Sequence, residues 1–154
     1  CGALACCVGP TRDNHLGKPV TRLEYEAFDA MTGPEMARIF ERCRKELEAD
    51  DGAHALRMLC QHRVGVVHVG EASVLIAVAS PHRELAFRAC RFLIDELKRT
   101  LPIWKKEFHV DGSHWVGERS CAALEPARSA IVRSRRARTA VRGCAQVVAL
   151  SAAE

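Results

Sequence analysis

Residues 95–107 read D-E-L-K-R-T-L-P-I-W-K-K-E and mark the place where a helix ends and a strand begins. Apolar residues recur at helical spacing before Pro102, and proline cannot continue a helix because it lacks the backbone N–H. We therefore expect Thr100 and Leu101 to be the last residues of the helix. The pattern after Pro102 indicates a strand.

Two lysines flank this bend, Lys98 near the end of the helix and Lys105 just beyond the turn. A chain reversal at Pro102 would point both ammonium groups at one place. Two lysines held close together repel each other, which lowers the pKa of at least one or demands an anion between them. The pattern is typical of a pocket for an anionic substrate. The alternative is a solvated helix end, where basic residues interact with the negative pole of the helix dipole.

The rest of residues 1–120 alternates between strand and helix patterns. One helix is expected to open at Thr32 with a capping box and the other at Ser80 as N-cap, each with a proline in its first turn. The apolar run Ala72–Ala79 is the candidate central strand. Further strands are expected at residues 3–8, 20–27, 55–64, 105–110 and 113–116, the last anchored by Trp115. This order predicts an α+β fold with two helices packed on a mixed or antiparallel sheet.

Three further residues are candidates for binding an anion. Arg12 follows the first strand, where its guanidinium could hold a phosphate or carboxylate by two hydrogen bonds. His82 and Arg83 stand at the start of the second helix, where free backbone N–H groups attract anions. A solvated loop arginine and a surface capping pair are the alternative interpretations.

The net charge of +4 belongs to the C-terminal segment. Residues 121–154 hold six of the 23 Lys and Arg and two of the 19 Asp and Glu, so residues 1–120 are neutral. A neutral body lacks the basic surface of a nucleic-acid-binding domain. We expect the Ala- and Arg-rich residues 121–154 to lie outside the fold, with a basic docking arm as the alternative. No apolar run reaches the ~18 residues of a membrane span and no signal-peptide pattern is present, which indicates a cytoplasmic protein.

The eight cysteines do not form a recognisable ligand pattern. Cys43, Cys60 and Cys90 fall in apolar-periodic segments, and the pair Cys6-Cys7 lies in the first strand. There is no C-x-x-C and no paired Cys/His spacing. We interpret the cysteines as small buried hydrophobes in a reducing compartment and expect no metal and no cofactor. Disulfides or a metal site are the alternative.

Seven segments taken together resemble the MoaE family, the large, catalytic subunit of molybdopterin synthase. They are G-P-T-R-D-N-H-L-G-K at 9–18, L-E-Y-E-A at 23–27, H-R-V-G at 62–65, V-G-E-A-S at 69–73, S-P-H-R at 80–83, L-K-R-T-L-P-I-W-K-K-E at 97–107 and D-G-S-H-W at 111–115. The matches cover residues 1–120 in order. The chain opens without an N-terminal segment that family members carry, and residues 121–154 match nothing in the family.

This resemblance implies an α/β-hammerhead fold and a sulfurtransferase. Such an enzyme converts cyclic pyranopterin monophosphate (precursor Z) into molybdopterin, in molybdenum cofactor biosynthesis. The sulfur would arrive as a thiocarboxylate on the C-terminal Gly-Gly of a small ubiquitin-like subunit, whose tail threads into the large subunit. Two large subunits would form a homodimer at the centre of a heterotetramer.

By the same resemblance, Lys98 and Lys105 match the family's two essential lysines. Lys98 would exchange a proton, and Lys105 would orient the thiocarboxylate and stabilise the developing charge. The substrate-binding positions implied by the resemblance are Arg12, His82, Arg83, Lys106 and Glu107. The first three would hold the phosphate, from the same chain or from the second copy, and Glu107 would position a lysine.

Three competing functions remain. One is a non-catalytic module that binds a ubiquitin-like tail or an anionic ligand. The second is a nucleic-acid binder that uses the arginines of residues 121–154. This function is less favoured because residues 1–120 carry no net charge. The third is a metal protein.

Overall fold

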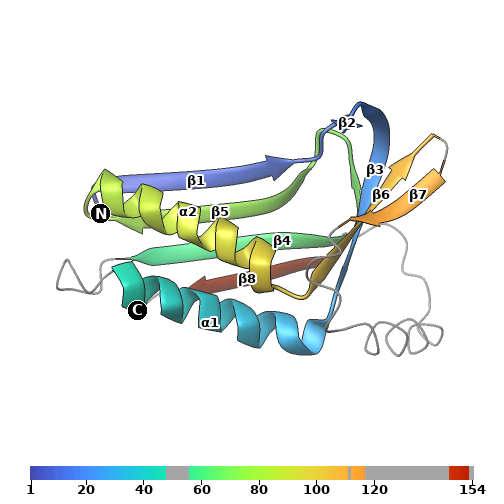
Figure 1. The fold of residues 1–154 in the computed structure, drawn as a ribbon. Helices are drawn as coiled ribbons and strands as arrows, with labels where there is room; N and C mark the ends of the chain where they lie inside the picture. Colours follow the sequence, from blue (N-terminus) through green and yellow to red (C-terminus); the bar gives the residue numbers. More distant parts are fainter. Residues whose placement is uncertain (48–55, 111, 117–145, 153–154) are drawn as a thin grey trace.

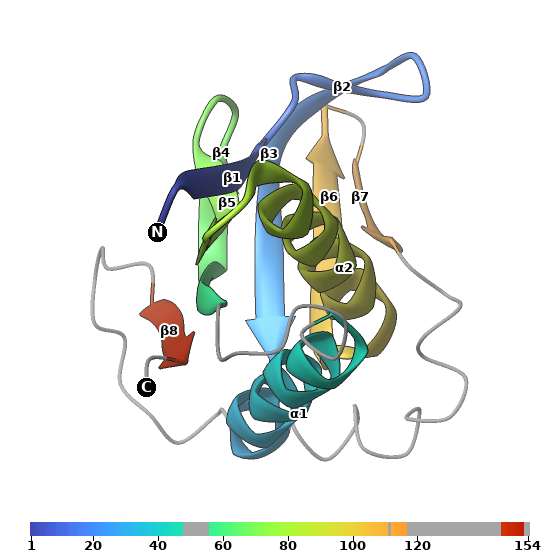
Figure 2. The ribbon, with the colours of Figure 1, turned by 90° about the vertical axis from the view of Figure 1, so that its left-hand side faces the viewer.

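Two helices lie side by side on one face of an antiparallel sheet (Figures 1 and 2). The computed structural model describes residues 1–47, 56–110, 112–116 and 146–152. Its elements are β1 (Ala3–Pro10), β2 (Asn14–His15), β3 (Lys18–Ala27), α1 (Asp29–Leu47), β4 (Arg57–His68), β5 (Ala72–Ser80), α2 (Arg83–Thr100), β6 (Ile103–His109), β7 (Gly112–Val116) and β8 (Gln146–Ala152). The sheet order is β1-β5-β4-β3-β6-β7, with β2 paired to β3 and β8 to β4. Because the pairings of these strands are antiparallel, the predicted α+β class is confirmed and the sheet is antiparallel rather than mixed.

Strand β4 joins two parts of the sheet that run in different directions. Its residues 57–62 pair with β5, whereas residues 65–68 pair with β3. Gly65 stands at the change of partner with φ of +87°, a conformation that costs glycine little because it has no Cβ. The strands β3, β6 and β7 therefore cross the end of the layer formed by β1, β5 and β4 (Figure 1). The strand expected at 55–64 thus continues through the kink to His68, and the chain turns only after that residue.

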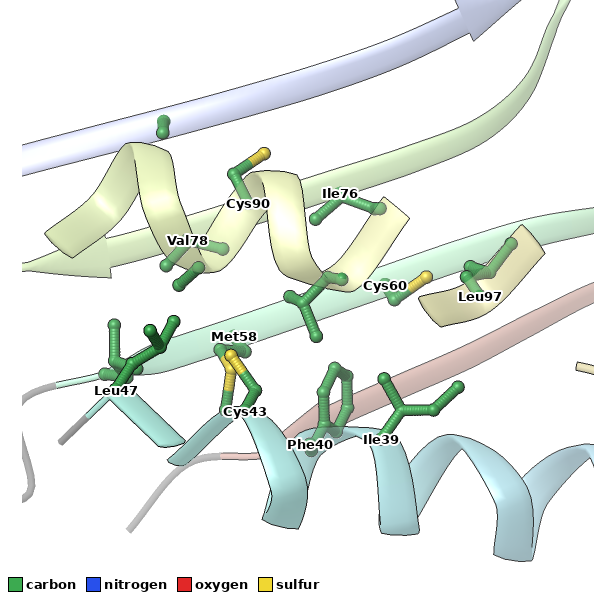
Figure 3. Packing of buried hydrophobic residues seen from close by; sticks show 14 of the residues in the cluster. Ile39, Phe40, Cys43, Leu47, Met58, Cys60, Ile76, Val78, Cys90 and Leu97 are labelled. Atoms are coloured by element: carbon green, nitrogen blue, oxygen red, sulfur yellow. The ribbon is translucent and has the colours of Figure 1, made fainter. Parts of the chain in front are cut away.

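The hydrophobic core fills the space between the two helices and strands β1, β5 and β4 (Figure 3). Ile39, Cys43 and Ile76 are completely buried. The apolar residues that recur at helical spacing in α1 are buried: Met36, Ile39, Phe40, Cys43 and Leu47. Alternate residues of the strand expected at 55–64 are buried as well: Leu56, Met58, Cys60 and His62. Period-3.6 and period-2 patterns thus identified both layers of the core correctly.

The six cysteines that the structure describes form no disulfide with one another. Cys43, Cys60 and Cys90 are buried, as predicted. Burial raises the pKa of the Cys60 thiol to about 12, so this side chain behaves as a small hydrophobe. Cys6 departs from the prediction because it lies on the exposed face of β1, which is the edge strand of the sheet.

Both helices begin at residues other than those predicted. Helix α1 starts at Asp29, and Thr32 is already inside it: the Thr32 hydroxyl donates to the Phe28 carbonyl at 2.9 Å instead of capping the helix. Helix α2 starts at Arg83 with His82 as N-cap, and the Ser80 hydroxyl donates to the His82 carbonyl at 2.5 Å. The predicted end of α2 is confirmed, because Thr100 is its last residue.

Two predictions near the C-terminus need correction. Residues 146–152 form strand β8 on the edge of β4 along residues 58–64, so this part of the segment 121–154 does not lie outside the fold. Residues 117–145 and 153–154 lie outside the described residues. Trp115 keeps 39% of its surface exposed and is not a buried anchor for β7. No helix in the described ranges is long and apolar enough to cross a membrane.

Truncating the core residue Ile39 should destabilise the fold strongly. Its side chain is 0% exposed and packs between α1 and the sheet. We expect Ile39→Ala to lower the free energy of unfolding by about 2–5 kcal/mol, from lost apolar contact and the cavity left behind. Urea denaturation measures this. Arg38→Ala, one residue earlier with a 70% exposed side chain, is the control and should change the value by less than ~0.5 kcal/mol.

The buried His62 should make stability depend on pH. Burial lowers its pKa below the ordinary 6.5, although the hydrogen bond that its Nδ1–H donates to the Arg63 carbonyl opposes this. The unfolded chain therefore takes up a proton near pH 6.5 while the folded chain does not, so stability falls as pH drops below about 6.5. His62→Gln should show a shallower decline between pH 7.5 and 5.5 in the free energy of unfolding. The exposed His68→Gln should keep the wild-type decline, and equal slopes for wild type and both variants would refute the assignment.

Candidate functional site

A cavity of about 650 Å³ opens where the C-terminal end of α2 meets β6 and the loop after β1. We call it the α2–β6 cavity. It is lined by Cys7, Val8, Gly9, Pro10, Thr11, Arg12, Asn14, His15, Val20, Leu23, Tyr25, His62, Ser73, Val74, Ile94, Leu97, Lys98, Leu101, Ile103, Trp104, Lys105, Glu107 and Val116. Its lining combines apolar side chains with three cationic ones, a combination that suits an anionic ligand with an apolar body.

The bend at Pro102 brings Lys98 and Lys105 into the lining of the same cavity. The N–H of Leu101, the C-cap of α2, donates to the Leu97 carbonyl at 3.1 Å, and the chain then reverses into β6. β6 pairs antiparallel with β3, which fixes the direction of its side chains. The bend that residues 95–107 predict is therefore present, and both lysines contribute to the lining of this cavity.

Glu107 forms an ion pair with Lys105, which lies two residues earlier on the same face of β6. The Lys105 Nζ lies 2.8 Å from Glu107 Oε1, and the Glu107 side chain is only 3% exposed. Its other oxygen, Oε2, accepts from His15 Nδ1 at 2.6 Å. Burial raises the pKa of Glu107, but the hydrogen bonds from Lys105 and His15 outweigh it, so the pKa lies below the ordinary 4.5. The carboxylate is thus charged near neutral pH and fixes Lys105 at the cavity wall.

Arg12 reaches the cavity from the loop after β1. The backbone of the preceding Thr11 is fixed to the β4–β5 turn, because its N–H donates to the Glu71 carbonyl at 2.8 Å and its carbonyl accepts from Gly70 at 2.9 Å. The Arg12 side chain itself is exposed. A fixed backbone with an exposed guanidinium suits a residue that binds an anion.

Three of the predicted site residues do not line this cavity. His82 and Arg83 stand at the opposite end of α2 from Lys98, about 22 Å away along the helix at ~1.5 Å per residue. Lys106 projects from the other face of β6, where its Nζ lies 5.1 Å from the centre of the Phe108 ring and 5.5 Å from that of Trp115. Within one chain, the cavity therefore gathers Arg12, Lys98, Lys105 and Glu107 from the predicted set.

Several polar residues of the cavity were not singled out from the sequence, among them His15, Tyr25, His62 and Ser73. Tyr25 and His62 lie edge to face with their ring centres 4.9 Å apart. Burial raises the pKa of Tyr25, despite a hydrogen bond with Ser73 that acts in the opposite direction, so its hydroxyl stays protonated. The available signal was period-2 alternation, which puts Tyr25 on the buried face of β3 with Leu23.

A cluster of possible metal ligands lies beside the cavity. One ligand atom from each of Glu107, His109 and His114 lies within 4.8 Å of the others. All three residues belong to the β6–β7 hairpin. In the described part of the chain, this is the group with the donor set and spacing of a metal site.

This chain is similar to known proteins in both sequence and structure. The profile of the family described as MoaE protein matches residues 1–100. A molybdopterin synthase catalytic subunit of Culex quinquefasciatus is 45% identical over 124 residues, covering 79% of this chain and 76% of the relative. The crystal structure of molybdopterin synthase from Staphylococcus aureus superposes with a TM-score of 0.69 at 35% identity, covering 76% of this chain and 81% of that one.

A more distant likeness shows the fold alone. A protein–protein complex of subunits 1 and 2 of molybdopterin-converting factor from Helicobacter pylori 26695 contains a chain with a TM-score of 0.59 and 21% identity, each chain being covered to 80%. The family profile and the relatives above 30% identity carry the assignment. The chain belongs to the MoaE family, the molybdopterin synthase catalytic subunits, which are enzymes of molybdenum cofactor biosynthesis.

Proposed function

We propose that the α2–β6 cavity is where this chain transfers sulfur to precursor Z, with a small ubiquitin-like subunit as the sulfur donor. The observation that carries the proposal is the meeting of Lys98, Lys105 and Arg12 in one cavity, with Glu107 holding Lys105. The substrate is a phosphate ester and the donor is a thiocarboxylate. Both are anions, and a cavity with three cationic side chains suits both.

The proposed role of Lys105 is electrostatic. The thiocarboxylate sulfur first bonds to a carbon of precursor Z, which makes a thioester between substrate and donor. Water then attacks the acyl carbon, so negative charge develops on its oxygen before the carbon–sulfur bond breaks and the donor leaves as a carboxylate. An ammonium group that is already oriented stabilises this charge without reorganisation. The contact of 2.8 Å to Glu107 Oε1 supplies that orientation in Lys105.

The proposed role of Lys98 is proton transfer. It projects from the last turn of α2 into the cavity, and its side chain is exposed. Sulfur addition and acyl release each move a proton, and an amine in reach of the reacting atoms can donate or accept it. Arg12 would hold the phosphate through a forked pair of hydrogen bonds.

The donor is proposed to be a separate small subunit whose C-terminal Gly-Gly tail enters the cavity. The Helicobacter pylori structure, a complex of two subunits of molybdopterin-converting factor, supports a two-component assembly. The cavity is bounded by apolar side chains such as Leu97, Leu101 and Trp104, against which an extended peptide can pack. We propose a homodimer of this chain within a heterotetramer.

His82 and Arg83 would then contribute to the cavity of the second copy in the dimer. At about 22 Å along α2 from Lys98, they cannot share its cavity in the same chain. Both side chains are exposed, and they precede a helix whose N-terminal N–H groups favour anions. We propose that they approach the phosphate bound in the cavity of the partner. Lys106 packs over Phe108 and Trp115 on the outer face of β6, so we leave it out of the substrate contacts of its own chain.

Replacing either cavity lysine should abolish most of the reaction. With thiocarboxylated small subunit and precursor Z supplied, we expect Lys98→Ala and Lys105→Ala each to slow molybdopterin formation by about 100-fold or more. Product is measured by its fluorescent oxidation derivative. Lys45→Ala, on the solvent face of α1, is the control and should retain wild-type rates. Near-normal rates in either cavity variant would contradict the proposed roles, and a wild-type chain that binds the donor without product would favour a binding module.

A mixing experiment tests whether the site is shared between copies. Lys98→Ala and Arg83→Ala chains, each inactive alone, are combined in one heterodimer with two affinity tags. If the site is shared, one of its two cavities keeps both Lys98 and the Arg83 of the partner, and the heterodimer should regain about half of the wild-type activity per dimer. If all residues act within one chain, both cavities carry a defect and the heterodimer stays inactive.

A further inference from the structure

The β6–β7 hairpin gathers three side chains with lone pairs on one face. Glu107 and His109 are two residues apart on β6, so they project to the same side. His114 is the direct cross-strand partner of Glu107 in the hairpin register. The imidazole Nε2 atoms of His109 and His114 lie 3.8 and 3.9 Å from Glu107 Oε2. The two rings are stacked 4.9 Å apart and inclined by only 4°, so both histidines present the same edge to the carboxylate.

The hydrogen bond of His109 leaves an unprotonated ring nitrogen facing this carboxylate, with no hydrogen-bond donor for its lone pair in the residues that the structure describes. Its Nδ1 lies 2.8 Å from the Pro19 carbonyl, and because a carbonyl can only accept, Nδ1 carries the proton. In the neutral ring, Nε2 then carries no proton. The His109 side chain is 5% exposed, and its Nε2 has no hydrogen-bond partner among the described residues. A buried acceptor facing a charged acceptor is unfavourable unless a cation lies between them.

We propose that Glu107, His109 and His114 bind a divalent first-row transition-metal ion, with Zn²⁺ as the candidate. Two imidazoles and a carboxylate are a donor set that Zn²⁺ takes, with a fourth position left for water. Bonds of ~2.0–2.1 Å at tetrahedral angles place ligand atoms about 3.3 Å apart. The separations of 3.8 and 3.9 Å therefore need to shorten by about half an ångström. His114, with a 53% exposed side chain, has the room to move inward.

The surroundings of the three ligands fit the proposed site. A histidine ligand is usually oriented by a hydrogen bond from its other nitrogen, and the Pro19 carbonyl does this for His109. The two Glu107 oxygens have different contacts: Oε1 holds Lys105, whereas Oε2 accepts from His15 Nδ1 at 2.6 Å and also faces the imidazoles of His109 and His114. A carboxylate oxygen has two lone pairs, so Oε2 can keep the contact with His15 and bind an ion with the other. An ion at Oε2 would thus leave the contact with Lys105 in place. It would tie β7 to β6 at the strand that carries Lys105 and Glu107, and this binding does not rest on the proposed sulfur transfer.

Metal binding is tested on the full-length, reduced and metal-stripped chain. Zn²⁺ titration against a chromophoric chelator, with elemental analysis after dialysis, should give one equivalent per chain. His114→Ala and His109→Ala should each weaken the affinity by more than about 100-fold, since loss of even an outer-shell partner costs ~10–100-fold. His114→Ala is the decisive variant, because its exposed side chain can be removed without disturbing the core. Zn²⁺ should also raise the melting temperature of the wild type and not that of His114→Ala.

Two controls separate this site from other ligands in the chain. His68→Ala removes an exposed histidine outside the cluster and should keep wild-type affinity. Co²⁺ substituted for Zn²⁺ should give a d–d spectrum without thiolate-to-metal charge transfer, which excludes the cysteines as ligands. Absence of saturable binding in the wild type would overturn the proposal and leave a shared proton as the cation between His109 and Glu107. Equal affinity in wild type, His109→Ala and His114→Ala, or a thiolate spectrum, would overturn it as well.

Discussion

Pro102 is the constraint on which the site depends. A helix cannot pass through it, so α2 ends at Thr100 and the chain must reverse into β6. The reversal is then held by the pairing of β6 with β3 over residues 103–109. Lys98 lies four residues before Pro102 and Lys105 lies three residues after it. Because the chain reverses between them, both lysines line the same cavity. Without the break, a continuous helix would place Lys105 on the same face as Lys98 but about 10 Å farther along the axis.

Glu107 connects this bend to the rest of the molecule. Its carboxylate receives Lys105 from its own strand and His15 from the hairpin that β2 and β3 form, so it joins two segments 92 residues apart. An ion pair in water contributes little, but a buried carboxylate that lost its partners would remain as an unpaired charge in the interior, which is strongly destabilising. The exposed pair Arg91–Asp95, with both side chains more than half exposed, has no such role. The same burial that makes Glu107 important for the fold keeps Lys105 oriented.

The body of the protein is held by a different kind of interaction. Residues such as Ile39, Ile76 and Leu93 are excluded from water between the helices and the sheet, and this apolar burial is the main stabilising term. The polar residues of the cavity lie instead where the C-terminal end of α2 meets β6, at the end of the sheet where β3, β6 and β7 diverge from β1, β5 and β4 (Figure 1). The divergence opens space between elements that are otherwise tightly packed, and the α2–β6 cavity occupies it. The same arrangement of strands thus packs the apolar core and leaves the cavity with its cationic side chains at one end of the sheet.

The sequence by itself determined the α+β class, the buried stripe of α1, the inner face of β4 and the end of α2, because these follow from periodicity and from proline within a few residues. It also identified the lysine bend. Helix starts were less accurate, since Thr32 and Ser80 bond to nearby carbonyls rather than capping a helix. Only the tertiary structure decided that β8 joins β4 and that His82 and Arg83 lie far from Lys98. It alone placed His109 and His114 beside Glu107, because strand register and partner choice depend on contacts between distant residues that no local pattern encodes.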